Sequence, residues 1–287
     1  MTKKLSLLAL GALLAAPLGA GATPLVFPAT FTGPEPNASN PAALNSVWLF
    51  SNVGTDEGTD IDLRLELLAT DNGAVNRIST TATNFEGKLR IGLGQSVVNN
   101  NGASATFKVS LLEAGTSKLA AVTDVSFLIT DVEQFTVGSA SGNEFYQVQS
   151  VTGADGTTTT VRNNPTNLNQ TLTTIPTPSG NDSGVEAFAT TGSEGDADPE
   201  SFFGYNYSAI SEFVFVWGFT GSTGGIGNNR GLNMDGDFND LQDLIDEFPS
   251  DPDITVVPEP SSTALLLAGV AGWAYLQRQR TRRKPRG

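Results

Sequence analysis

The sequence contains no cysteine and no histidine. Without cysteine the chain cannot form disulfides, so an exported domain must rely on its core or on bound metal for stability. Without histidine it lacks the usual general base of enzymes and the commonest zinc ligand. Ser-His-Asp and Cys-His catalysis are therefore excluded, as is a histidine-containing metalloprotease site.

Basic residues are scarce and unevenly placed. All 30 acidic residues lie between Glu35 and Glu259, whereas eight of the 16 bases lie outside that segment. The segment therefore carries about 22 net negative charges, which argues against nucleic acid as a partner. Solubility, cation binding or repulsion from anionic surfaces agrees better with this charge.

The N-terminal end has the three parts of a secretory leader. Two lysines, Lys3 and Lys4, precede an apolar run from Leu5 to Leu18, and Ala20 and Ala22 form an A-x-A cleavage site. We predict a signal peptide at 1–22, cut after Ala22 by signal peptidase once the export translocon has engaged it. The alternative, a retained anchor, is disfavoured by Pro17 and the nearby glycines.

The C-terminal end combines a proline motif, a short apolar stretch and a basic cluster. Pro258, Glu259 and Pro260 precede the apolar stretch from Ala264 to Leu276, which as a helix is about 20 Å long, short of the roughly 30 Å hydrocarbon core. The bases that follow hold this end in the cytoplasm; they are Arg278, Arg280, Arg282, Arg283, Lys284 and Arg286. We expect a short transmembrane helix, with the acidic domain across the membrane.

This arrangement resembles the PEP-CTERM sorting signal of Gram-negative bacteria over residues 257–287. The resemblance implies an exosortase as partner, a membrane cysteine transpeptidase that removes the tail near the motif. It also implies an inner-membrane intermediate and a final place on the cell surface or in an exopolysaccharide matrix. A second Pro-Glu-Pro, at 34–36, has no apolar helix or basic cluster behind it. The alternative is an ordinary single-span anchor after a proline turn.

The central region shows the period-2 alternation of half-buried strands. It occurs at 61–67, 89–93, 105–111 and 125–129, and 47–50 is a predicted opening strand. In 213–219 aromatic residues alternate with valines, which predicts a central strand covered on both sides. With turns rich in Gly, Asn and Asp, and almost no helical periodicity, the predicted fold class is all-β, a β-sandwich or jelly roll.

These patterns divide the chain into four parts. We expect the signal peptide at 1–22, a β-sandwich ectodomain at 23–250, a linker at 251–257 and the sorting tail at 258–287. Within the ectodomain, residues 152–200 are rich in Thr, Asn, Gly, Ser and acids and contain four prolines. That composition predicts a flexible excursion from the sandwich.

Oxygen-bearing side chains recur from position 235 at the spacing of positions 1, 3, 5, 9 and 12 of an EF-hand loop. They are Asp235, Asp237, Asn239, Asp243 and Asp246. The sixth position is Asp240 instead of glycine, so the prediction is an unorthodox calcium site; the alternative is a solvated acidic helix at 239–248. No other cofactor is expected. A smaller acidic group, Asp56, Glu57 and Asp60, is interpreted as a turn.

No residue is assigned a catalytic role. The leading hypothesis is a noncatalytic exported protein of the cell surface or matrix. One alternative is a carbohydrate-binding module that stacks aromatic rings on exopolysaccharide; its candidates are Phe202, Phe203, Tyr205 and Tyr207. Another is a histidine-free glycoside hydrolase with a carboxylate pair drawn from Asp124, Asp131 and Glu133. The simpler interpretations are that the aromatic residues pack in the core and that the acids merely flank a strand.

Overall fold

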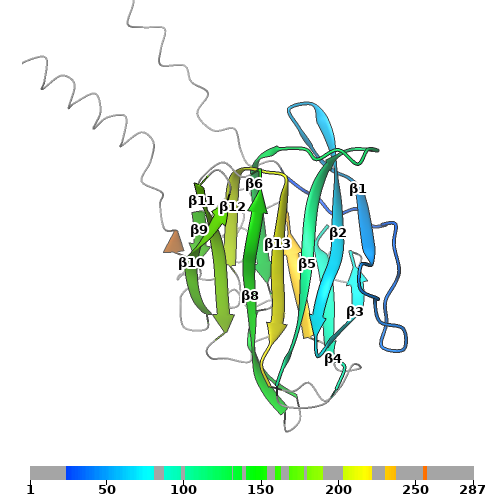
Figure 1. The fold of residues 1–287 in the computed structure, drawn as a ribbon, viewed down its shortest axis with the longest axis vertical. Coiled ribbons are helices and arrows are strands. Elements are labelled where there is room, and N and C mark those ends of the chain that lie inside the picture. Colours follow the sequence, from blue (N-terminus) through cyan, green and yellow to red (C-terminus); the bar gives the residue numbers. More distant parts are fainter. Residues whose placement is uncertain are drawn as a thin grey trace, which may run out of the picture.

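The structure is a computed structural model that describes residues 24–80, 87–97, 101–130, 132–137, 140–153, 159–162, 168–177, 180–189, 203–221, 230–236 and 255–256. These residues form two antiparallel sheets that pack face to face (Figure 1). The described part contains strands and no helix. The prediction of an all-β sandwich is therefore confirmed for the described residues, whereas the predicted signal peptide and C-terminal helix lie outside them.

Each sheet combines strands that are far apart in the sequence. The first sheet has the order β1 (Val47–Asp56), β2 (Thr59–Asp71), β5 (Ala103–Glu113), β13 (Glu212–Phe219), β8 (Ala140–Thr152), β11 (Gly180–Ala189) and β10 (Leu168–Thr177), and β7 (Gln134–Val137) also pairs with β8. The second has the order β15 (Thr255–Val256), β9 (Thr159–Arg162), β12 (Phe203–Ile210), β6 (Val122–Thr130), β14 (Arg230–Asp235), β4 (Leu89–Gln95) and β3 (Gly73–Ser79).

The alternating segments form the strands that their patterns predict. Strands β1, β2, β4, β5, β6 and β13 contain them, and the apolar residue of each alternation points between the sheets, where it is buried. Strand β13 lies between β5 and β8 as expected of a central strand. On its outer face Val216 is buried as predicted, whereas Val214 is only half-buried.

The core is dominated by aromatic rings. Phe215 stacks between Phe107 and Tyr146, with ring centroids 5.3 and 5.1 Å away. The hydroxyls of Tyr146 on β8 and Tyr205 on β12 lie 2.6 Å apart and form a hydrogen bond between the two sheets. Burial raises the pKa of both phenols well above the usual value, so both remain neutral.

The segment expected as a flexible excursion contains more structure than predicted. Residues 168–177 and 180–189 form the hairpin β10–β11, paired from Leu168 opposite Ala189 to Thr177 opposite Gly180. The expected linker contributes Thr255 and Val256, which pair with β9 as β15. Threonine explains the first difference, because its branched Cβ favours extended backbone even where the composition is that of a loop.

An N-terminal arm, residues 24–46, precedes β1 and is part of the fold. The Leu25 amide donates to the Gly236 carbonyl at 2.7 Å, and the Phe27 amide donates to the Gly87 carbonyl at 3.0 Å. The side chains of Leu25 and Phe27 are both buried in the core. The arm thus connects the beginning of the described chain to the end of β14.

Candidate functional site

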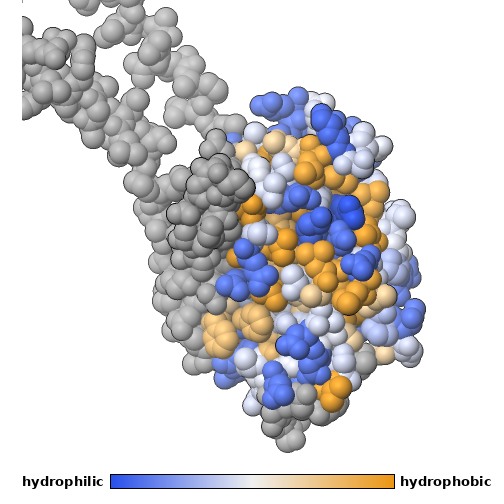
Figure 2. Space-filling model, in the orientation of Figure 1, coloured by the Kyte–Doolittle hydropathy of each residue, from blue (hydrophilic) through white to orange (hydrophobic). Residues whose placement is uncertain are grey.

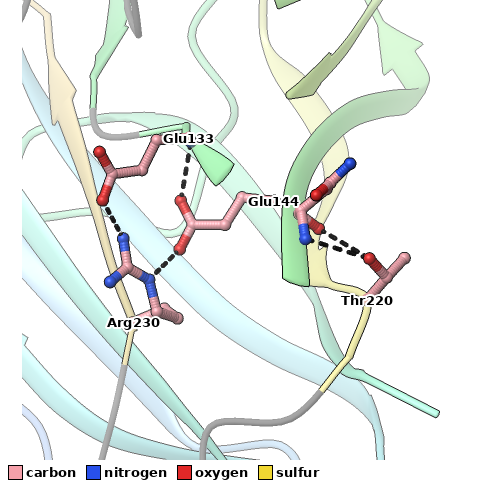
Figure 3. A network of polar contacts seen from close by, with 5 residues as sticks. Glu133, Glu144, Thr220 and Arg230 are labelled. Atoms are coloured by element: carbon pink, nitrogen blue, oxygen red, sulfur yellow. Dashed lines mark hydrogen bonds and ion pairs between the residues drawn. The ribbon is translucent and has the colours of Figure 1, made fainter. Parts of the chain in front are cut away.

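Three charged side chains meet between the sheets at one end of the sandwich (Figure 3). Arg230, the first residue of β14, donates from Nε to Glu144 Oε1 on β8 at 2.6 Å. Its Nη2 pairs with Oε1 of Glu133, which lies between β6 and β7. The Glu133 amide in turn donates to Glu144 Oε2 at 3.2 Å. One guanidinium therefore holds two carboxylates, one from β8 of the first sheet and one from the segment between β6 and β7.

The two carboxylates of this network are buried, and 16% of the Arg230 side chain is exposed. The Glu144 side chain has no exposed surface, and only 8% of the Glu133 side chain is exposed. The Arg230 guanidinium lies 4.8 Å from the centre of the Phe135 ring, a cation–π distance. Next to Glu144, the Asn143 amide donates to Thr220 Oγ1 at 3.1 Å, which fastens β8 to the end of β13 (Figure 3).

Burial raises the pKa of Glu144 from 4.5 to about 8. The Arg230 ion pair and hydrogen bond and the Glu133 amide lower it, but they do not offset the loss of hydration, and the Glu133 charge raises it further. A folded-state pKa above the unfolded-state value means that the folded protein holds this proton more tightly. The stability contributed by Glu144 is then complete below the unfolded-state pKa and is lost as the pH rises through about 8.

The Glu144→Gln variant should reveal this linkage. Between about pH 5 and about pH 9, the free energy of unfolding of the wild type should fall by a few kcal/mol more than that of the variant, because glutamine has no proton to lose. Urea unfolding across this range measures both curves. All other titrating groups are common to the two proteins, so the difference isolates Glu144. Parallel curves would contradict a raised pKa at this position.

Two of the three carboxylates proposed for a hydrolase, Asp124 and Glu133, lie at opposite ends of one strand. Asp124 is the third residue of β6, whereas Glu133 follows the end of that strand. The strand between Asp124 and Thr130 alone spans roughly 20 Å, more than twice the separation of most glycosidase carboxylates. Glu133 is buried and pairs with Arg230, and Asp131 lies outside the described residues.

The aromatic candidates for sugar stacking whose side chains are described also lie in the core. Tyr205 and Tyr207 are 1% exposed and pack in the core. Their rings contact each other at 5.9 Å, and Tyr205 also contacts Phe127 and Phe213. The side chains of Phe202 and Phe203 lie outside the description. A carbohydrate site would therefore have to use residues other than Tyr205 and Tyr207.

The acidic group at 56–60 forms a turn, as interpreted from the sequence. Glu57 and Gly58 connect β1 to β2 with φ values of 47° and 85°, the signs of a type I′ hairpin. Asp60 Oδ1 accepts from Thr55 Oγ1 at 2.8 Å, and Asp56 Oδ1 accepts from Thr123 Oγ1 at 2.7 Å. Asp60 thus stabilises the hairpin itself, and Asp56 bonds the hairpin to β6.

The structure describes only the first of the five proposed calcium ligands. Asp235 ends β14 and pairs with Lys88 at 3.4 Å. Asp237, Asn239, Asp243 and Asp246 lie outside the described residues, so the calcium site stays a prediction. Within the described ranges, no group of three or more carboxylates is arranged to hold a metal ion.

The outer face of the first sheet carries much of the remaining charge. Glu66 accepts from Arg64 at 2.9 Å and lies 3.7 Å from Lys108, which also lies 3.7 Å from Glu212. Ser110 donates to Glu212 at 2.6 Å. Figure 2 shows hydrophilic residues scattered among apolar ones on the visible face of the molecule. Bases and acids on this face neutralise each other.

The segments expected to direct export lie outside the described residues. These include the cleavage-site residues Ala20 and Ala22, the motif 258–260 and the basic cluster 278–286. In the part of the chain that is described, we find no helix with the length and hydrophobicity needed to cross a membrane.

Comparison with known proteins does not assign the chain to a family, since no family model and no curated protein matches it. The N-terminal domain of the Streptococcus gordonii adhesin Sgo0707 is 13% identical, with a TM-score of 0.38 over 72% of this chain and 48% of that one. The adhesin domain of PrgB from Enterococcus faecalis is 10% identical, with TM-scores of 0.37, and 0.34 when bound to DNA, over 69% of this chain. Our chain thus spans about half the length of the Sgo0707 domain.

Proposed function

We propose that this chain is a noncatalytic exported protein of the cell surface or exopolysaccharide matrix, delivered through the leader at 1–22 and the sorting tail at 258–287. In this function the ectodomain is a stable β-sandwich, the leader is removed by signal peptidase and the tail is recognised by an exosortase. The alternative of a carbohydrate-binding module is compatible with the same route. A hydrolase is disfavoured because Glu133 and Glu144 are buried and both pair with Arg230.

The described arm next to the predicted cleavage site supports this proposal most directly. Leu25, three residues after Ala22, is buried, and its amide donates to the Gly236 carbonyl. A leader cut after Ala22 would leave a mature chain that starts at Thr23, two residues before this buried leucine. Cleavage at that bond would therefore keep Leu25 and its bond to Gly236 in the mature protein.

The sorting function predicts a specific product in the native cell. Mass spectrometry of the mature protein should find Thr23 at its N-terminus and no arginine-rich tail. In a Glu259→Ala variant we expect the form with the intact tail to accumulate in the inner membrane, because the exosortase recognition motif is damaged. The measurement is the mass of the C-terminal peptide in each cell fraction.

The second Pro-Glu-Pro provides a matched control. Glu35→Ala makes the same change in the same tripeptide, but Glu35 lies in the folded arm. Its tail should be processed like that of the wild type. An intact tail on the surface form of the wild-type protein would refute sorting by an exosortase.

A further inference from the structure

An open pocket lies between the N-terminal arm and the end of β3. It has a volume of about 390 Å³, within the range of about 300–1,000 Å³ of small-molecule sites. The arm contributes Thr30, Phe31 and Glu35, and the end of β3 contributes Ile78 and Ser79, with Thr80 next to it. The pocket belongs neither to the buried network nor to the segments proposed for sorting.

Hydrogen bonds fix the walls of this pocket. Trp48 Nε1 donates to the Pro34 carbonyl at 2.6 Å, which holds the loop that carries Glu35. Thr80 Oγ1 donates to the Pro28 carbonyl at 2.7 Å and joins the two walls. The Thr32 and Leu49 backbones exchange two bonds, of 2.9 and 2.8 Å. Binding would therefore require little ordering of the protein, which favours affinity.

The lining combines apolar and polar side chains. The Phe31 ring packs against Phe50 at 5.3 Å and keeps part of its surface exposed, and Ile78 is buried. Hydroxyl-bearing side chains, among them Thr30 and Ser79, also line the pocket. Glu35 is exposed, and within the described ranges no lysine or arginine pairs with it.

The charge of the domain selects among possible ligands. With about 22 net negative charges between Glu35 and Glu259, the protein repels anions and attracts cations. An ammonium group next to the Glu35 carboxylate would gain a charge-assisted hydrogen bond. An apolar ring face suits the Phe31 ring, and ring hydroxyls suit the threonine and serine side chains. All three features occur together in an amino sugar.

We propose that this pocket binds a protonated amino sugar residue of a polysaccharide, with Glu35 paired to its ammonium group and Phe31 packed against its ring. This role also accounts for the Pro-Glu-Pro at 34–36. The two prolines stiffen the backbone around Glu35, and Trp48 fixes the first of them. The carboxylate is thereby held at the rim of the pocket.

Calorimetric titration of the full chain with three probes tests the proposal. The probes are the glucosamine trimer, the N-acetylglucosamine trimer, which lacks the ammonium groups, and spermidine, which has them but lacks the sugar ring. At mildly acidic pH we expect the glucosamine trimer to bind at least about fivefold more tightly than either other probe. Equal affinity for the N-acetylated trimer or for spermidine would overturn the proposal.

Two variants locate the binding and one controls for charge. Glu35→Gln should weaken binding of the glucosamine trimer about fivefold, and Phe31→Leu, which keeps the contact with the core, about threefold. Asp71→Asn removes an exposed charge at the opposite end of β3 from the pocket and should change the affinity less than about twofold. If Glu35→Gln behaves like Asp71→Asn, this pocket is not the site. The proposed sorting depends on residues 258–287 and not on this pocket. A failed binding test would therefore leave the sorting proposal unaffected.

Discussion

Replacing Arg230 with methionine should lower the free energy of unfolding by about 3 to 5 kcal/mol, because it leaves the buried Glu133 carboxylate without its cation and removes a hydrogen bond from Glu144. Methionine preserves most of the packing against Phe135 but cannot bond Glu133 or Glu144. This loss of stability should exceed the loss caused by breaking any exposed ion pair of this protein. Urea unfolding near neutral pH measures it, provided that the transition remains two-state.

Two controls separate the effect of leaving buried charges unpaired from the effect of losing a side chain. Lys118→Met breaks an ion pair with Glu113 at the surface, where 72% of the lysine side chain is exposed, and should lower stability by less than about 1 kcal/mol. Adding Glu133→Gln and Glu144→Gln to Arg230→Met should recover much of the loss, since no buried charge remains. Equal effects of Arg230→Met and Lys118→Met would refute a stabilising role for the network.

Phe215→Ala should also lower the free energy of unfolding by about 3 to 5 kcal/mol, through lost burial and the cavity left behind. Its ring is fully buried between Phe107 and Tyr146, at the level where the Tyr146–Tyr205 hydrogen bond joins the sheets. Without disulfides the sandwich has no covalent cross-link to limit the damage. Urea and thermal unfolding measure the effect.

The neighbouring residue on the same strand provides a matched comparison. Val214 points to the outer face of β13 and is half-buried, so Val214→Thr keeps the branched side chain while leaving the core unchanged. Its effect should remain below about 1 kcal/mol. A comparable loss in both variants would mean that the strand, and not the aromatic stack, limits stability.

The strands could be predicted from the sequence, but their partners could not. Alternation in 61–67 or 105–111 marks a face that must be buried, which is a local property of the chain. The order of strands depends on which faces meet, and adjacent strands here come from distant segments, as when β13 pairs with both β5 and β8. The hairpin β10–β11 was missed because its many polar residues resemble a loop.

Only part of the buried network could be predicted from the sequence, for the same reason. Glu133 was noticed beside an apolar strand, but its partner Arg230 lies 97 residues further along, and Arg230 and Glu144 are 86 residues apart. One signal could have found it. Arg230 is a rare base in an acidic segment and begins β14, in which Leu232 and Met234 alternate with Gly231 and Asn233, so a buried charge there requires a counter-ion.

Strand β14 also determines when the second sheet can be completed during synthesis of the chain. A chain that emerges from a ribosome or an export channel presents β4 and β6 more than a hundred residues before the strand that lies between them. Until then both have unpaired edges, which other nascent chains can join. The second sheet therefore cannot be completed before β14 is synthesised, when Arg230 can pair with Glu133 and Glu144 and Gly236 can bond Leu25. Chaperone protection would matter most during that interval.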